Sequence, residues 1–157
     1  MNNKELIEFV FYHEKEIKQA VFEKREDGCL PKTGGGGSGH CRVSDPTAQN
    51  AIRKALEVPA VMIEYGAKTC GRRNSITLRH PEKWLKVIQY TRDYFNGTAS
   101  GALFKMRYAE CLTREEACEK LKISVKQYHV MTSNIIKFAE GAAFTSGLIT
   151  RKWGFHK

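Results

Sequence analysis

The stretch that decides the fold is residues 113–132, TREEACEKLKISVKQYHVMT. Thr113 is followed three residues later by Glu116, which is the pattern of a capping box and predicts that a helix begins at residue 114. Residues 122–124 then interrupt the helical pattern, and Ser124 is a residue type that caps a following helix. We therefore predict two consecutive helices joined by a tight turn.

The inward-facing side chains of the first helix include two small residues, and those of the second helix are mostly apolar. Small residues on the first helix let the second cross it closely, where a Leu or Phe would hold the backbones apart. The predicted inward side chains are Ala117, Cys118 and Leu121, then Ile123 in the turn, and Tyr128, Met131 and Ile135. This is the packing of a helix-turn-helix from about residue 113 to residue 139.

In a helix-turn-helix the start of the second helix can enter the major groove of DNA. Lys126 would then reach a guanine edge or a phosphate, Gln127 would pair with adenine, and Val125 would touch a thymine methyl. The expected outward residues of the helix at about 124–138 are Ser124, Val125, Lys126, Gln127, His129, Val130 and Ser133.

Three further cations, Arg114, Lys122 and Lys137, are better placed to contact phosphates, which adds affinity without sequence information. The alternative interpretation is a plain helical hairpin in a core, with these charged residues as a solvated face. The pattern favours sequence-specific binding of double-stranded DNA over this alternative.

The charge of the chain agrees with a polyanionic partner. The net charge is +9, and it is uneven: residues 1–29 have a balance of −2, residues 30–96 of +6 and residues 97–157 of +5. A positive field of this size favours nucleic acid, although it also serves simple solubility.

Outside the helix-turn-helix the chain is expected to be mainly α-helical. Apolar residues at three- and four-residue steps predict one amphipathic helix over residues 3–25, and others over 81–95 and about 100–110. Residues 61–65 and 75–78 are rich in β-formers and predict a small hairpin, with a helical turn at 60–66 as the alternative.

The expected fold is therefore a helical body with a possible small β-hairpin and a C-terminal helix-turn-helix. The expected parts are an N-terminal helix in 1–28, a Gly-rich linker in 29–43, a middle helical region in 44–96, the helix-turn-helix domain in 97–146, and a basic tail in 147–157. Within the middle region, Ser44 and Pro46 predict a helix that Pro59 ends. Whether residues 1–30 pack on the rest of the chain stays open at this point.

Residues 103–124, LFKMRYAECLTREEACEKLKIS, resemble region 4 of sigma-70-type factors. There, a helix that ends in Arg-Tyr or Arg-Phe precedes a Leu-Thr-x-Glu-Glu helix and a turn of the form x-Ile/Val-Ser. The longer layout is similar to phage-type RinA/ArpU transcriptional regulators: a Gly-rich stretch, SDPTA at 44–48, HPEKWL at 80–85, and the C-terminal motif. The resemblance spans about residues 33–150.

The resemblance implies a regulator, and more specifically an activator, of phage or prophage late genes that acts with RNA polymerase. A full sigma factor also carries an aromatic-rich segment that melts the promoter, and this chain shows no such segment. Independent promoter opening is therefore not expected.

No catalytic motif is found, so the chain is expected not to be an enzyme and to need no cofactor. Cys29, His40, Cys41 and Cys70 are residue types that bind zinc, but none forms a Cys-x2-Cys pair, so no metal site is expected. The chain has no membrane-length apolar run and no signal peptide, which predicts a cytoplasmic protein without a membrane partner.

Two other functions stay open. A small terminase subunit for DNA packaging also combines a helix-turn-helix with helices for oligomerisation, so a homo-oligomer remains an alternative. A helical protein-interaction module that contacts RNA polymerase is the second, with the aromatic residues Trp84, Trp153 and Phe155 as anchors.

Overall fold

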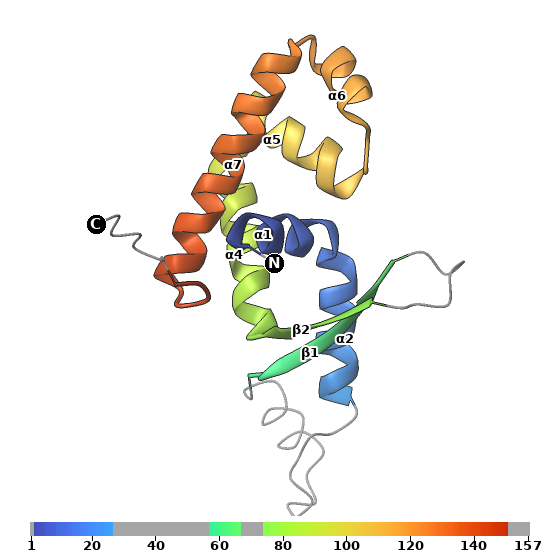
Figure 1. The fold of residues 1–157 in the computed structure, drawn as a ribbon, viewed down its shortest axis with the longest axis vertical. Coiled ribbons are helices and arrows are strands. Elements are labelled where there is room, and N and C mark those ends of the chain that lie inside the picture. The colour runs from blue at the N-terminus through green and yellow to red at the C-terminus, as the bar shows by residue number, and fades with distance from the viewer. Residues whose placement is uncertain (1, 27–56, 67–73, 151–157) are drawn as a thin grey trace, which may run out of the picture. The chain divides into compact units, whose positions relative to one another are not determined.

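The structure of the protein is a computed structural model that describes residues 2–26, 57–66 and 74–150. It is mainly α-helical with one two-stranded antiparallel sheet, which confirms the predicted fold class (Figure 1). The described elements are α1 (Asn3–Tyr12), α2 (Glu14–Glu26), β1 (Ala60–Tyr65), β2 (Asn74–Arg79), α4 (Pro81–Phe95), α5 (Ala99–Phe104), the π-helix η2 (Lys105–Ala109), α6 (Arg114–Leu121) and α7 (Val125–Thr145).

Several predicted features lie outside the described residues. These are the Gly-rich linker at 29–43, the helix predicted from Ser44 to Pro59 except for its last residues, and positions 151–157 of the basic tail. Cys29, His40, Cys41 and Cys70 also lie outside the described residues. Within the described ranges, no helix is both long enough and apolar enough to cross a membrane.

The chain forms two compact units. One unit contains residues 1–14 and 83–157, and therefore α1, most of α4, α5, η2, α6 and α7. The other contains residues 15–82, with α2 and the two strands. The sequence left open how residues 1–30 pack. α1 belongs to the unit that carries the helix-turn-helix, whereas α2 belongs to the other unit.

The single helix predicted over residues 3–25 is wrong, because the chain leaves the helical conformation at His13. Its φ of −105° and ψ of 24° lie outside the α-helical range, although its N–H still donates to the Phe9 carbonyl at 3.0 Å. The helical spacing of apolar residues continues through this break. Val10 is buried on α1, and Ile17 and Val21, seven and eleven residues later, are buried on α2. Periodicity alone therefore could not reveal it.

The hairpin in the second unit is confirmed, and the alternative of a helical turn at 60–66 is wrong. β1 and β2 pair with Ala60 opposite Arg79 and Tyr65 opposite Asn74. Val61, Ile63 and Leu78 are buried, which gives the sheet one apolar face. The two strands are the arrows labelled β1 and β2 in Figure 1.

In the first unit, α4 has the predicted bounds, but the helix predicted at about 100–110 is two different helices. Thr98 caps α5 by accepting a hydrogen bond from the Gly101 N–H. From residue 105 the hydrogen bonding widens to a π-helix, a form that spacing rules do not predict. Gly101 is required here, because a Cβ at this position would lie 2.2 Å from the Phe95 carbonyl oxygen.

The core of this unit is built by α1, α4, α5, η2 and α7. Phe11 is its largest fully buried side chain, and its ring lies 4.9 Å from the rings of both Phe104 and Tyr108, measured between centroids. α7 contributes Ile135 and Ala139, which are also buried. The helix extends to Thr145, seven residues beyond the predicted end at 138, so its C-terminal half belongs to this core.

Candidate nucleic-acid interface

The helix-turn-helix has the predicted caps at both of its helix starts. The Thr113 hydroxyl accepts from the Glu116 N–H at 3.3 Å, and the Glu116 carboxylate accepts from the Thr113 N–H at 2.9 Å. The same reciprocal pair joins Ser124 and Gln127 at the start of α7. Each box satisfies backbone donors that a helix start otherwise leaves unpaired, so both starts are firmly defined.

The turn between the helices depends on Lys122. This residue has a left-handed backbone, with φ 53° and ψ 42°, and ends α6. The next residue, Ile123, donates its N–H to the Cys118 carbonyl at 3.1 Å, which reverses the chain within three residues. The turn therefore has one defined shape.

α6 and α7 meet over a small apolar cluster, as predicted. Leu103, Ala117 and Tyr128 are buried together, and the side chains that pack against them are Cys118, Leu121, Ile123 and Met131. Ala117 has no exposed surface, so no larger side chain fits at the crossing without moving a helix. Figure 1 shows α6 beside the N-terminal half of α7.

All ten side chains predicted to bind DNA are exposed: Arg114, Lys122, Ser124, Val125, Lys126, Gln127, His129, Val130, Ser133 and Lys137. Four of them, Lys126, Val130, Ser133 and Lys137, follow each other at steps of three or four residues and therefore share one side of α7. We call these four residues the outer stripe. Arg114 and Lys122 lie on α6 and in the turn, outside it.

The charge of the outer stripe itself is positive, and the first acid of α7 on this side is Glu140, three residues after Lys137. Residues 124–139 contain two lysines and no Asp or Glu, whereas α6 carries three glutamates. Within the described part of the chain, neither Lys126 nor Lys137 forms an ion pair, so both charges are available to a ligand. The face of the motif that suits an anion is therefore α7 and not α6.

The structure gives two of the predicted polar residues a structural role. The Gln127 side-chain oxygen accepts from the Ser124 N–H at 2.8 Å and from the Ser124 hydroxyl at 3.0 Å. A bidentate contact with adenine needs that same amide oxygen as an acceptor. In this geometry Ser124 and Gln127 fix the start of α7, and the Gln127 oxygen that the predicted base contact needs is already engaged.

Arg114 is also engaged locally. Its guanidinium donates to the Glu115 carboxylate at 2.6 Å and 3.0 Å, and this hydrogen bond lowers the pKa of Glu115 below its ordinary value. A phosphate would have to compete with Glu115 for the same donors. Lys122 and Lys137 are the better phosphate candidates among the predicted three.

A cation that the sequence analysis missed holds the motif to α1. Arg107 of η2 donates to the Tyr128 hydroxyl and, at 3.3 Å, to the Glu8 carboxylate, and its guanidinium lies 5.9 Å from the Tyr12 ring centroid. Burial alone would lower the pKa of Arg107, but Tyr108, Tyr12 and the hydrogen bond to Tyr128 raise it above its ordinary value. Arg107 therefore links α1 to the first turns of α7. No local spacing signals this link, because Glu8 and Tyr128 are far apart in the sequence.

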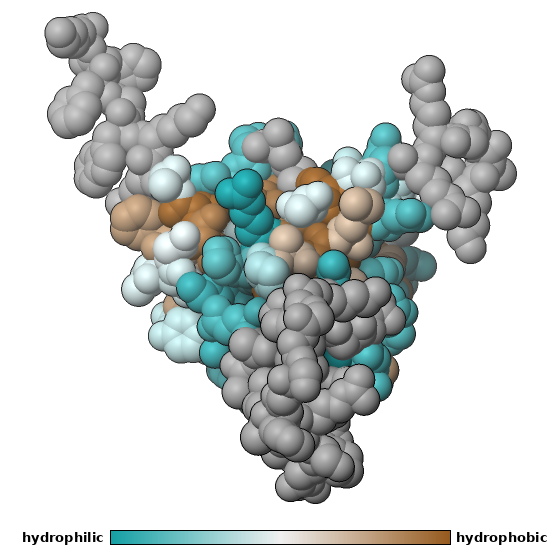
Figure 2. Space-filling model, turned by 90° about the horizontal axis from the view of Figure 1, so that it is seen from below, coloured by the Kyte–Doolittle hydropathy of each residue, from teal (hydrophilic) through white to brown (hydrophobic). Residues whose placement is uncertain are grey.

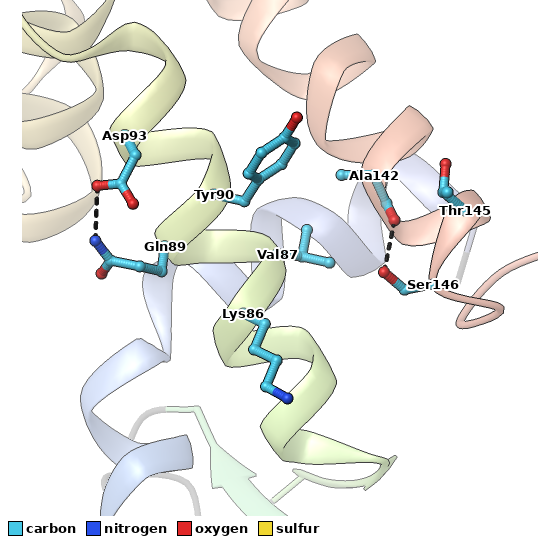
Figure 3. A pocket seen from close by; sticks show the side chains of 8 residues that line it. All are labelled: Lys86, Val87, Gln89, Tyr90, Asp93, Ala142, Thr145 and Ser146. Atoms are coloured by element: carbon cyan, nitrogen blue, oxygen red, sulfur yellow. Dashed lines mark hydrogen bonds between the residues drawn. The ribbon is translucent and has the colours of Figure 1, made fainter.

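An aromatic cluster on α4 and α7 was also missed. Phe138 makes stacked contacts with Tyr94, at a centroid distance of 4.1 Å, and with Tyr90, at 5.5 Å, and both tyrosines are about 60 % exposed. The spacing of four between the tyrosines is the signal that could have revealed it. Beside this cluster, α4 and the C-terminal part of α7 line an open pocket of about 560 Å³ (Figure 3).

The prediction that Trp84 anchors a protein interface is wrong. Its side chain is 3 % exposed and belongs to the core, because α4 turns this face inward. Trp153 and Phe155 lie outside the described residues. Figure 2 shows one face of the molecule, on which apolar residues form separate patches among polar ones.

Within the described residues, no group of three or more His, Cys, Asp or Glu side chains is arranged to hold a metal ion. Comparison of the chain with models of protein families, with curated proteins and with solved structures finds no match.

Proposed function

We propose that the protein is a sequence-specific DNA-binding protein that inserts the start of α7 into the major groove of duplex DNA. The observation that carries this proposal is the outer stripe: an exposed side of α7 that carries Lys126 and Lys137 and no acid before Glu140. The first turn of this helix is fixed by a capping box and by a tight turn. A helix that enters the major groove needs a defined orientation and an exposed face of this kind.

The positions of the three lysines along the motif assign them different contacts with DNA. Lys126, in the first turn of α7, would reach a guanine edge on the groove floor. Lys137 lies three turns further along the helix, and Lys122 lies in the preceding turn, so these two would contact phosphates at the groove walls. The three glutamates of α6 favour an orientation in which α6 stays away from the phosphates.

The biological role in this proposal is transcription regulation, most specifically activation of phage late genes in the cytoplasm. Its support is the resemblance of residues 103–124 to region 4 of sigma-70-type factors, together with a structure that has both helices and both caps. The proposed partners are duplex DNA and RNA polymerase.

The test is selection of bound sequences from a random duplex library by the full-length protein, followed by affinity measurements on the selected site. Lys126→Ala should weaken binding about tenfold and relax the preference at one base pair. Lys105→Ala removes an equal charge from an exposed residue of η2 and should leave the preference intact. If no sequence is enriched, or if both variants behave alike, the groove assignment is wrong.

A second candidate, a protein-interaction module, is favoured by the stacked cluster of Tyr90, Tyr94 and Phe138. Exposed aromatic side chains next to a pocket are typical of protein contact sites. The partner in this case would be RNA polymerase, bound in the absence of DNA. Co-elution of purified polymerase with the protein, lost in Tyr94→Ala, would support this candidate over DNA binding.

A further inference from the structure

Two apolar side chains of α7 are exposed near its start. Val125 is 48 % exposed and Val130 is 53 % exposed, whereas Ile135 and Ile136 of the same helix are buried. β-Branched residues are also weaker helix formers than Ala, Lys or Gln. Exposed valines at these two positions therefore serve neither the core nor the helix.

Two of the polar side chains beside these valines, Ser124 and Gln127, are not free to read a base. Gln127 and Ser124 hold each other in the capping box, through the contacts at 2.8 Å and 3.0 Å. In the first six residues of α7, the exposed side chains that remain are the two valines, Lys126 and His129. Half of this set is apolar.

In the major groove, the 5-methyl group of thymine is the apolar feature of the base edges, and it distinguishes thymine from the other bases. We propose that the protein selects its site by packing Val125 and Val130 against thymine methyl groups. The ligand class is thus duplex DNA with thymines at defined positions. This inference rests on the proposed insertion of α7 into the major groove.

The spacing of the two valines limits where the thymines lie. Five residues correspond to about 7.5 Å along a helix axis and, at about 3.6 residues per turn, to about 140° around it. The two valines therefore leave α7 in different directions and cannot contact the same methyl group. We therefore expect two separate thymine positions in the bound site, one for each valine.

The test uses deoxyuridine, which keeps the pairing of thymine and removes only its methyl group. The full-length protein is first used to select a site from random duplex, and its affinity is then measured for versions with one thymine at a time replaced by deoxyuridine. At each contacted thymine the affinity should fall about fourfold, which corresponds to the burial of one methyl group.

Variants connect each methyl group to one valine. Val125→Ala should abolish the thymine-to-uracil difference at one position and keep it at the other, and Val130→Ala should do the reverse. Both positions are exposed in a helix, where alanine is well tolerated, and circular dichroism checks the fold. Phe144→Ala, at another exposed apolar residue of α7, is the matched control and should keep both differences.

The outcomes separate the two proposals. If a selected site binds specifically but every deoxyuridine replacement leaves the affinity unchanged, the thymine inference is overturned and the proposed function stands. If the protein enriches no duplex sequence, the proposed function fails and the inference fails with it. Differences that persist in both valine variants would also overturn the inference.

Discussion

At the scale of single residues, Lys122 combines a strained backbone with a charge that the proposed function uses. A non-glycine residue in the left-handed conformation costs about 1–2 kcal/mol. Glycine removes this cost, but its greater freedom in the unfolded chain offsets part of the gain. Lys122→Gly should therefore raise the free energy of unfolding by about 0.5 kcal/mol in urea titrations, and at the same time weaken DNA binding.

Lys122→Ala is the matched variant for this prediction. It removes the same charge and keeps the strain, so affinity should fall as in Lys122→Gly while stability does not rise. Equal stability of the two variants would contradict the role assigned to the left-handed turn.

Arg107 is the residue whose loss should damage the motif most directly. Its half-buried guanidinium bonds to Tyr128 and Glu8, so Arg107→Ala leaves both partners without a donor. We expect a loss of about 2–4 kcal/mol in the free energy of unfolding, measured with urea. Arg114→Ala, which breaks an exposed pair with Glu115, should leave the free energy of unfolding nearly unchanged.

At the scale of elements, the start of α6 should depend on acid pH. Hydrogen bonds from the Thr113 backbone and hydroxyl lower the pKa of Glu116 below its ordinary value. A carboxylate with a lowered folded-state pKa stabilises the fold above its unfolded-state pKa, and this contribution is lost as pH falls through the lower, folded value. The loss therefore falls below the ordinary glutamate pKa of about 4.3.

Two substitutions at Glu116 isolate this effect in thermal melts between pH 7 and pH 2.5. Glu116→Gln keeps a capping acceptor at every pH, so its stability should change less with acid than that of the natural protein. Glu116→Ala lacks the acceptor at every pH and should already be less stable at pH 7. An unchanged acid profile in Glu116→Gln would contradict the assignment.

The elements also show how far the sequence could predict this structure. The helix-turn-helix was predictable because its determinants are local: two capping boxes, a small residue at 117 and an apolar residue at 123. The break at His13 was not predictable, since the apolar spacing continues through it. The length of α7 was underestimated because its C-terminal half is held by contacts with distant segments.

For the candidate site, the sequence predicted which side chains are exposed, but not which of them form hydrogen bonds within the protein. Lys126, Val130 and Lys137 follow from helical spacing alone. The engagement of Gln127 in a capping box was also readable from its position three residues after Ser124, although the prediction used it for a base contact. The link through Arg107 depends on tertiary contacts and had no local signal.

At the scale of the whole molecule, the unit that carries the motif is completed by the N-terminus. Phe11 of α1 is buried against Phe104 and Tyr108, close to the start of the motif. Phe11→Ala should lower the free energy of unfolding by about 3–5 kcal/mol, the range for a buried phenylalanine. DNA affinity should fall with it, because α6 and α7 share this unit.

Phe22→Ala is the control for this prediction, since Phe22 is 60 % exposed and lies in the other unit. It should change stability by no more than about 0.5 kcal/mol. If both variants lose little stability in urea titrations, α1 does not support the motif.

The central claim, that cations around α7 contact the phosphates of duplex DNA, is tested most directly by the salt dependence of binding. The slope of log affinity against log salt should become less steep by about 1.8 in a Lys122→Ala/Lys137→Ala double variant, since each lost phosphate contact accounts for about 0.9. A Lys4→Ala/Lys105→Ala double variant removes the same charge from exposed residues of α1 and η2 and should keep the slope of the natural protein. Equal slopes for the two double variants, or no binding of duplex DNA at low salt, would contradict the claim.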